Sequence, residues 1–240
     1  MSRIEKLKGN YLKEDTKKLI IIGDSAFAQI AYEYFTYDSP FNVVAFSVDS
    51  EFIRQEKLFG LPVVPFEELE EHYDPAEYYV FVAIAYTRLN RLRARFYKEA
   101  KRKGYRFASY VSSHAFVWRN VELGENCFIF EDNTIQPFVK IGNNVVIWSG
   151  NHIGHHSKIR DHVFISSHVV VSGFVEIGEY SFLGVNSTIV NNIKIAKDNV
   201  LGAGAVIIRD TEAGKVYVGN PARPLEKSSY EVFNVRADEI

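Results

Sequence analysis

Short apolar runs alternate with helix-compatible segments over the first hundred residues of the chain. Four consecutive aliphatic residues at 19–22 predict a buried strand, which Gly23 ends. Further segments of both kinds follow: a helix at 26–37, strands at 42–48, 61–64 and 78–85, a basic helix at 88–103 and a strand at 107–111. Strands that alternate with helices predict parallel βαβ units and a small doubly wound α/β sheet.

After residue 110 the pattern changes to a strict period of six. Every sixth position from Val111 to Ile207 is Ile, Leu or Val, which gives 17 aliphatic positions before Ala213 breaks the run. Gly directly follows six of them, and small or β-branched residues stand four positions after many of them. An amphipathic helix repeats every 3.6 residues, so the period excludes a helix. It predicts a β-solenoid with its aliphatic side chains stacked along the axis as one core.

Composition is that of an ordinary globular protein and removes several classes of function. The 240 residues are 47% hydrophobic and 24% charged, and the formal net charge is −2. Such a charge gives no broad surface for nucleic acid, and no apolar run reaches the ~20 residues of a membrane span. One cysteine excludes a disulfide framework and a cysteine-based zinc site. A charged N-terminus that lacks the apolar stretch of a signal peptide favours a cytoplasmic protein.

The six-residue repeat resembles that of the hexapeptide-repeat transferases. The segments 150–157 and 218–223, together with the preceding βαβ region, narrow the resemblance to the sialic-acid-cluster and PglD-like sugar acyltransferases. The resemblance implies a Rossmann-like domain followed by a left-handed parallel β-helix, in which three hexapeptides make one coil. It divides the chain into an extension at 1–17, a nucleotide-sugar-binding domain at 18–109, an acyltransferase β-helix at 110–224 and a tail at 225–240.

The same resemblance implies an activity. Members of the family move an acetyl group from acetyl-CoA to the amine of a nucleotide-linked amino sugar. They are homotrimers with active sites between subunits. Two alternatives remain open at this point: acetylation of a sugar hydroxyl, and a non-catalytic solenoid that binds a partner through its groove.

Five of the seven histidines crowd one stretch of the expected solenoid, and His155 is the candidate base. It stands two positions after the core residue Ile153, so its side chain should point outward near a corner. Gly173 lies one coil of 18 residues later, where it leaves room for the imidazole and lets a backbone N–H approach a ligand. Neutral His suits proton removal from an amine near pH 7, and an N–H donor suits the oxyanion of acyl transfer.

His155 and the Gly173 amide are therefore predicted as general base and oxyanion donor, and His155 also matches the family's catalytic His. The alternative is a histidine cluster that packs at a trimer interface. The family has a carboxylate beside this His, whereas here the neighbour is His156, which is either an auxiliary catalytic residue that orients His155 or a structural one. A zinc site between subunits is not predicted, because no pair of histidines is separated by four residues.

The resemblance also indicates where CoA would bind. It places the CoA arm in a groove between subunits, next to residues two positions after the core aliphatics, and the CoA nucleotide beside the tail motif. The matching residues are Phe164, Gly173, Val185, Ala203, Asn220 and Arg223. Small residues at solenoid corners and an exposed Arg also have purely structural explanations.

The turn at 23–28 follows a strand and opens a helix, which is where a phosphate-binding loop is expected. It lacks the glycine fingerprint of dinucleotide-binding proteins, so a redox role is not predicted. Residues expected at the same sheet edge, where the nucleotide sugar would bind, are Asp24, Ser25, Ala26, Asp49, Tyr86 and Thr87. Arg88 and Arg91 either meet phosphate there or belong to the solvated face of a basic helix.

Overall fold

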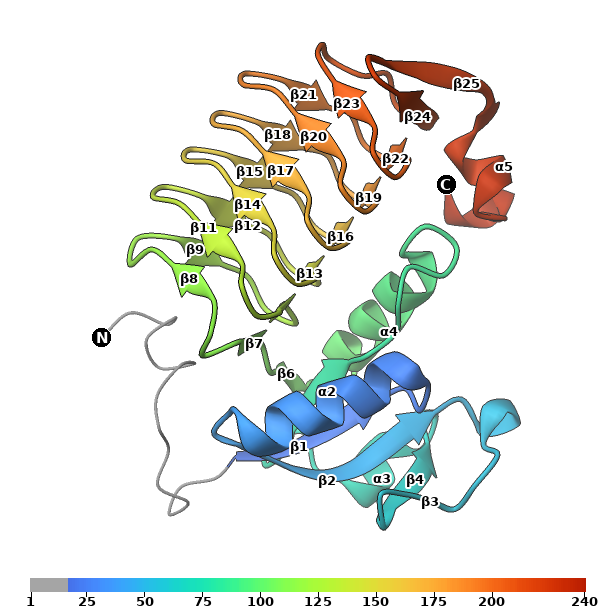
Figure 1. Cartoon of the computed structure of the whole chain (residues 1–240). Helices are drawn as coiled ribbons and strands as arrows, with labels where there is room; N and C mark the ends of the chain where they lie inside the picture. The colour runs from blue at the N-terminus through green and yellow to red at the C-terminus, as the bar shows by residue number, and fades with distance from the viewer. Residues whose placement is uncertain (1–16) are drawn as a thin grey trace.

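The computed structural model describes residues 17–240; apart from Lys17, the extension expected at 1–17 lies outside the described residues. An α/β part with its sheet and helices occupies one end, and a stack of triangular coils rises from it (Figure 1). The C-terminal segment leaves the last coil and folds back toward α4 (Arg91–Arg102).

The α/β part is a six-stranded sheet in the order β3-β4-β2-β1-β5-β6. All neighbours pair in parallel except β3 and β4. The strands are β1 (Lys17–Ile22), β2 (Phe41–Val48), β3 (Lys57–Leu58), β4 (Leu61–Pro65), β5 (Tyr79–Val82) and β6 (Arg106–Phe107). Helix α2 (Ala26–Tyr37) packs on one face, and α3 (Leu69–His72) and α4 on the other. Coverage of both faces explains why the run at 19–22 is fully buried.

Two boundaries differ from the sequence-based expectations. The basic helix begins at Arg91 rather than at residue 88, because Arg88, Leu89 and Asn90 all have positive φ values (50°, 50° and 65°) and form a left-handed turn. The strand expected at 107–111 is split into β6 and β7 (Tyr110–Val111), since the chain leaves the α/β sheet and enters the β-helix there. The short elements β3, α3 and η2 (Ser50–Phe52) have no counterpart in the expectations.

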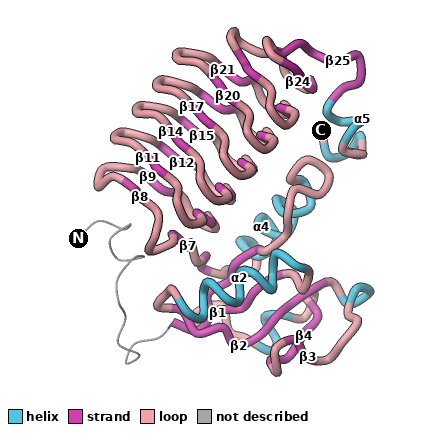
Figure 2. The backbone as a smooth tube through the Cα atoms, viewed as in Figure 1, coloured by secondary structure: helices cyan, strands magenta, loops and turns pink. Residues whose placement is uncertain are grey.

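Three parallel sheets form the sides of the β-helix, and each coil contributes one two-residue strand to each side (Figure 2). The domain-facing sheet contains β7, β10 (Phe128–Ile129), β13 (Val146–Ile147), β16 (Phe164–Ile165), β19 (Phe182–Leu183), β22 (Val200–Leu201), β24 (Lys215–Gly219) and the antiparallel β25 (Ala222–Ser228). The uncharged sheet contains β8 (Phe116–Val117), β11 (Thr134–Ile135), β14 (His152–Ile153), β17 (Val170–Val171), β20 (Thr188–Ile189) and β23 (Val206–Ile207). The charged sheet contains β9 (Glu122–Leu123), β12 (Lys140–Ile141), β15 (Lys158–Ile159), β18 (Glu176–Ile177) and β21 (Lys194–Ile195).

The 17 aliphatic positions of the six-residue period form the axis of the β-helix, as the sequence predicts. Sixteen of them are buried and Val117 is partly buried against the same cluster. Strands one coil apart pair in register, for example Ile135 with Ile153 and Ile153 with Val171. Each of these side chains gains roughly 1.5–3 kcal/mol from burial, which makes the stacked column the main source of stability in this part.

The three sheets present different side chains to the outside, and this decides what each can contact. The domain-facing sheet points apolar residues such as Tyr110, Phe128 and Phe164 into the cluster that contains α2, and they are buried there. The charged sheet exposes residues such as Lys140 and Lys158. The outward positions of the uncharged sheet carry no Asp, Glu, Lys or Arg; they are Phe116, Trp118, Thr134, Gln136, His152, Gly154, Val170, Ser172, Thr188, Val190, Val206 and Ile208.

The corners of the coils contain a second column of period six that the sequence analysis did not detect. Fourteen residues, six apart, have positive φ, and they are Asn126, Asp132, Phe138, Asn144, Gly150, His156, His162, His168, Phe174, Tyr180, Asn186, Asn192, Asp198 and Gly204. Asn, Asp and Gly tolerate this left-handed conformation best, and His is also enriched in it. Three of the five crowded histidines therefore stand at corner positions.

The corner column predicts a specific stability effect at Asn186, an exposed residue with φ 58°. Asn186→Ala should destabilise the protein by about 1 kcal/mol, because an alanine Cβ is strained in the left-handed region, whereas Asn186→Gly should be milder. Urea unfolding of the two variants side by side measures this difference. Equal destabilisation by Ala and Gly would show that the side chain of Asn186, rather than its backbone conformation, matters.

None of the helices between residues 17 and 240 is long and apolar enough to cross a lipid bilayer.

Candidate active site

His155 lies in the corner that follows β14, with its side chain exposed. Its backbone N–H donates to Oε1 of Gln136 at 3.0 Å. Its ring meets the ring of Phe174 edge-on, with 5.1 Å between centroids and an interplanar angle of 88°. The imidazole is thus solvent-accessible yet held on two sides, as a residue that exchanges protons with a ligand must be.

Gly173 occupies the same corner one coil later, beside the His155 ring. A Cβ added to Gly173 would lie 2.8 Å from Cε1 and 2.9 Å from Nε2 of His155, too close for any side chain. The structure therefore accounts for glycine here through the space that the imidazole needs. No hydrogen bond within residues 17–240 uses the Gly173 N–H. A free N–H next to a free imidazole edge is the arrangement that stabilisation of an oxyanion requires.

His156 lies between two phenylalanine rings from the adjacent coils. The rings of Phe138 and Phe174 stack on its two sides, with centroid distances of 4.6 and 4.7 Å and interplanar angles of 28° and 15°. Its Nδ1 is 3.1 Å from Nδ1 of His155. Gln136, Phe138 and Phe174 were not among the expected site residues, although the spacing of 18 residues between 138, 156 and 174 could have indicated the stack.

The acidic residues closest in sequence to this region do not reach His155 within the chain. Glu131 and Asp132 are in a corner after the domain-facing sheet, and Asp161 is in one after the charged sheet. The carboxylate of Glu131 accepts hydrogen bonds from Ser149 and Tyr34, which hold its pKa below the ordinary value although burial opposes this. Asp161 accepts from the N–H of Asn143 at 2.8 Å. The side-chain partner of His155 is accordingly His156.

The residues expected to contact CoA fall into separate groups. Gly173 lies beside His155, whereas Val185 and Ala203 are exposed at a different corner, after the domain-facing sheet. The exposed turn with Asn220 and Arg223, which joins β24 to β25, stacks next to the Ala203 corner because Leu201 pairs with Tyr217. A single chain therefore does not bring the two corners together.

Phe164 departs from its expected role in a CoA groove. Its side chain is only 2% exposed and packs against Tyr86, with ring centroids 5.1 Å apart. The reason is that Phe164 points outward from the domain-facing sheet, which the α/β part covers. This placement makes it a residue of the contact between the two parts of the chain.

The residues expected to bind a nucleotide lie at the carboxyl edge of the α/β sheet, after β1, β2 and β5. The turn with Asp24, Ser25 and Ala26 begins at Gly23, where an added Cβ would lie 2.9 Å from the Ala83 carbonyl oxygen. Ser25, Ala26 and Thr87 are exposed, as is 44% of Tyr86. Asp49 forms an ion pair with Arg95 at 2.5 Å. Both line an open cavity of about 590 Å³ together with Arg88, Arg91, Lys98, Arg102 and Arg236.

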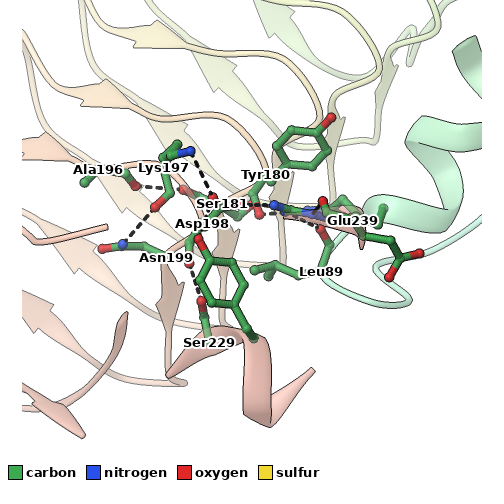
Figure 3. A network of polar contacts seen from close by, with 12 residues as sticks. Leu89, Tyr180, Ser181, Ala196, Lys197, Asp198, Asn199, Ser229 and Glu239 are labelled. Atoms are coloured by element: carbon green, nitrogen blue, oxygen red, sulfur yellow. Dashed lines mark hydrogen bonds and ion pairs between the residues drawn. The ribbon is translucent and has the colours of Figure 1, made fainter. Parts of the chain in front are cut away.

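Arg91 does not play either of its expected roles, because it is buried in a polar network between α4 and the β-helix (Figure 3). Its guanidinium forms an ion pair with Asp198 at 2.5 Å and lies 3.9 Å from the centroid of the Tyr180 ring. Asp198 also receives a hydrogen bond from Tyr230, and its carbonyl accepts one from Ser229. The network therefore ties α4 to the corner column and to the C-terminal segment.

Arg88 contacts the same segment through an ion pair with Glu239 at 2.7 Å.

Two further basic groups are buried where α4 meets the β-helix. Burial lowers the pKa of Arg93 to about 9, and its Nη2 donates to the Val163 carbonyl at 3.4 Å. Burial, reinforced by the positive charge of Arg93, lowers the pKa of His162 to about 3. His162 is consequently neutral near pH 7, and its Nδ1 is 2.9 Å from the amide nitrogen of Asn144.

The low pKa of His162 predicts acid sensitivity of the fold. Because the unfolded chain binds a proton near pH 6.5 and the folded chain does not, stability is lost as pH falls from about 6.5 toward 3. Between pH 7 and 5 this group alone should remove about 2 kcal/mol. Urea unfolding at both pH values should show a smaller loss for His162→Asn, which tolerates the positive φ at this corner. An undiminished loss in that variant would assign the acid sensitivity to other groups.

Among residues 17–240, no group of three or more His, Cys, Asp or Glu side chains is arranged to hold a metal ion.

Comparison with known proteins places the repeat and the fold. Residues 120–155 and 138–173 match the bacterial transferase hexapeptide family, described as six repeats. A search of curated proteins found no match to the sequence.

Several solved structures are similar over most of the chain. The acetyltransferase domain of PglB from Neisseria gonorrhoeae is 24% identical, with a TM-score of 0.79, and the match covers 88% of this chain and 100% of that one. A variant of perosamine N-acetyltransferase from Caulobacter crescentus, in complex with CoA and GDP-perosamine, is 24% identical with a TM-score of 0.78 and coverages of 88% and 97%. WeeI from Acinetobacter baumannii is 23% identical with a TM-score of 0.73 and coverages of 88% and 100%. The chain shares their fold, and the sequence-based prediction of a Rossmann-like domain followed by a left-handed parallel β-helix is confirmed.

Proposed function

We propose that the protein transfers an acetyl group from acetyl-CoA to the amine of a nucleotide-linked amino sugar. The observation that carries the proposal is the exposed imidazole of His155 beside the free N–H of Gly173. Two proteins of the same fold have names and ligands that agree with it: perosamine N-acetyltransferase with CoA and GDP-perosamine, and the PglB acetyltransferase domain with acetyl coenzyme A.

Each residue of the pair has one task in this reaction. As the amine nitrogen bonds to the thioester carbon, Nε2 of His155 accepts the proton that the nitrogen loses. The negative charge that develops on the carbonyl oxygen is stabilised by the Gly173 N–H. When the C–S bond breaks, the protonated His155 returns its proton to the leaving sulfur, so the imidazole is neutral again and free CoA and the amide are the products.

A second copy of the chain would complete the CoA site. The outward positions of the uncharged sheet carry no charged residue, and Phe116, Trp118, Val170 and Ile208 are each 40–53% exposed there. A face of this kind is suited to packing against another protein surface. In a homotrimer, Val185, Ala203, Asn220 and Arg223 of one subunit would then line the groove beside His155 and Gly173 of the next.

The nucleotide part of the substrate would bind at the carboxyl edge of the α/β sheet. Asp24, Ser25 and Ala26 follow β1 there, Asp49 follows β2, and the segment with Tyr86 and Thr87 follows β5. Arg88 and Arg95 line the adjoining cavity, and guanidinium groups bind phosphate oxygens in pairs of hydrogen bonds. Such a site suits an anionic diphosphate, while the ion pair between Arg95 and Asp49 would rearrange on binding.

Release of CoA thiol from acetyl-CoA, measured with a panel of nucleotide-linked sugars, tests the proposal. We expect release with amino sugars that carry a free amine and none with the matching hydroxyl sugars. Release with the hydroxyl sugars alone would replace N-acetylation by O-acetylation. Folded protein that neither binds CoA nor releases thiol with any acceptor would favour a binding module and contradict the proposal.

A further inference from the structure

We propose that His156 is a positioning residue that fixes the tautomer of His155, in the place where the carboxylate expected beside a catalytic histidine is missing. The inference rests on the proposed function of His155 as the base. It concerns which ring nitrogen of His155 holds the proton before the reaction begins.

The contact between the two rings allows only two productive states of hydrogen bonding. The Nδ1 atoms of His155 and His156 are 3.1 Å apart, so one must carry a hydrogen while the other offers a lone pair. If His155 carries the hydrogen on Nδ1, its Nε2 has the free lone pair and faces Gly173. In the opposite state Nε2 of His155 holds the hydrogen and cannot accept a proton from an amine.

The environment of His156 fixes the plane of its ring. Its backbone has φ 60°, and its N–H donates to the Pro137 carbonyl at 3.2 Å. Phe138 and Phe174 cover both ring faces, so rotation of the imidazole would require separating two stacks. The edge that carries Nδ1 is therefore held toward His155.

This arrangement differs in kind from a carboxylate partner. A carboxylate accepts the Nδ1 hydrogen and also stabilises the imidazolium by its charge, whereas a neutral imidazole only accepts the hydrogen. The role of His156 is thus to select the tautomer and to orient the ring. Because water can take over part of that role in an exposed corner, we expect His156→Ala to lower kcat roughly 10- to 100-fold, less than the ~10⁴-fold that a wrong tautomer costs a serine protease.

Nitrogen-15 NMR of protein labelled at histidine tests the tautomer directly and without a substrate. We expect the signal that is lost in His155→Asn to belong to the Nδ1–H tautomer in the wild type near pH 8, and to become a mixture of tautomers in His156→Ala. His168→Ala, which removes an imidazole from another exposed corner with φ 58°, is the matched control and should leave the His155 signal unchanged.

Kinetics of acetyl transfer provide the second readout. His156→Ala should lower kcat and leave the KM for acetyl-CoA within about twofold, and His156→Asp should restore kcat because a carboxylate can accept the same hydrogen. An Nε2–H tautomer of His155 in the wild type, or an unchanged kcat in His156→Ala, would overturn the inference. A wild type that transfers no acetyl group overturns the proposed function, while the NMR comparison still decides whether His156 sets the tautomer of His155.

Discussion

Replacement of His155 by Asn should lower kcat for acetyl transfer by roughly 10²–10⁴-fold, the range that a general base usually contributes. Asn has no nitrogen that can take a proton from the amine, yet it is similar in size and leaves the space beside Gly173 occupied. Binding of CoA should be unaffected within about twofold, since the imidazole acts on the reacting atoms alone. Single-turnover thiol release together with calorimetric binding of CoA separates these two effects.

His72→Asn is the matched control, because His72 is an exposed histidine of the α/β part whose side chain is 47% accessible. Its kcat should equal that of the wild type. If His155→Asn retained kcat, the base would have to be another group, and the role of the Gly173 N–H would lose its geometric support.

The largest stability effect is expected at the ion pair between Arg91 and Asp198, whose side chains are only 7% and 1% exposed. Arg91→Ala would leave the Asp198 carboxylate buried without its cationic partner, and this should cost about 3–5 kcal/mol. The same change removes the cation over the Tyr180 ring and the contact of the Arg91 Nε with the Glu239 carbonyl. Urea unfolding, followed by far-UV circular dichroism, measures the loss.

Arg102→Ala on the same helix is the control, because its side chain is 75% exposed and its ion pair with Glu99 spans 3.9 Å. That change should alter stability by less than about 1 kcal/mol. Double replacement Arg91→Met with Asp198→Asn should recover part of the loss, since it removes both charges. A loss of similar size in Arg91→Ala and Arg102→Ala would show that the buried pair has no special weight.

The repetitive part of the molecule could be predicted almost completely from sequence. A period of six with 17 aliphatic residues defines one axis, and burial of Ile153, Ile165 and Leu183 follows directly from it. The position of His155 relative to Gly173 could be predicted for the same reason, because 18 residues separate equivalent points of adjacent coils. In a regular coil, distance along the sequence converts into distance in space.

Features that depend on contact between the two parts of the chain could not be predicted this way. Phe164 and Val185 both follow the repeat, but only Phe164 faces the α/β part and is buried by it. Arg91 reads as one cation of a basic helix, and its partner Asp198 is more than 100 residues away. The role of His156 at a corner depends on backbone conformation, which the aliphatic period does not report.

The uniform length of the coils restricts how this protein can change in size. Removal of six residues between His155 and Gly173 would bring residue 179, a glutamate, into the place of the glycine and rotate every later side chain by one side of the triangle. Insertions or deletions of 18 residues would keep all three sides aligned. Added beyond Phe174, one such unit would raise the C-terminal turn by about 4.8 Å, the spacing of neighbouring strands. Growth and shortening of this chain are therefore compatible with its chemistry only in whole turns of the prism.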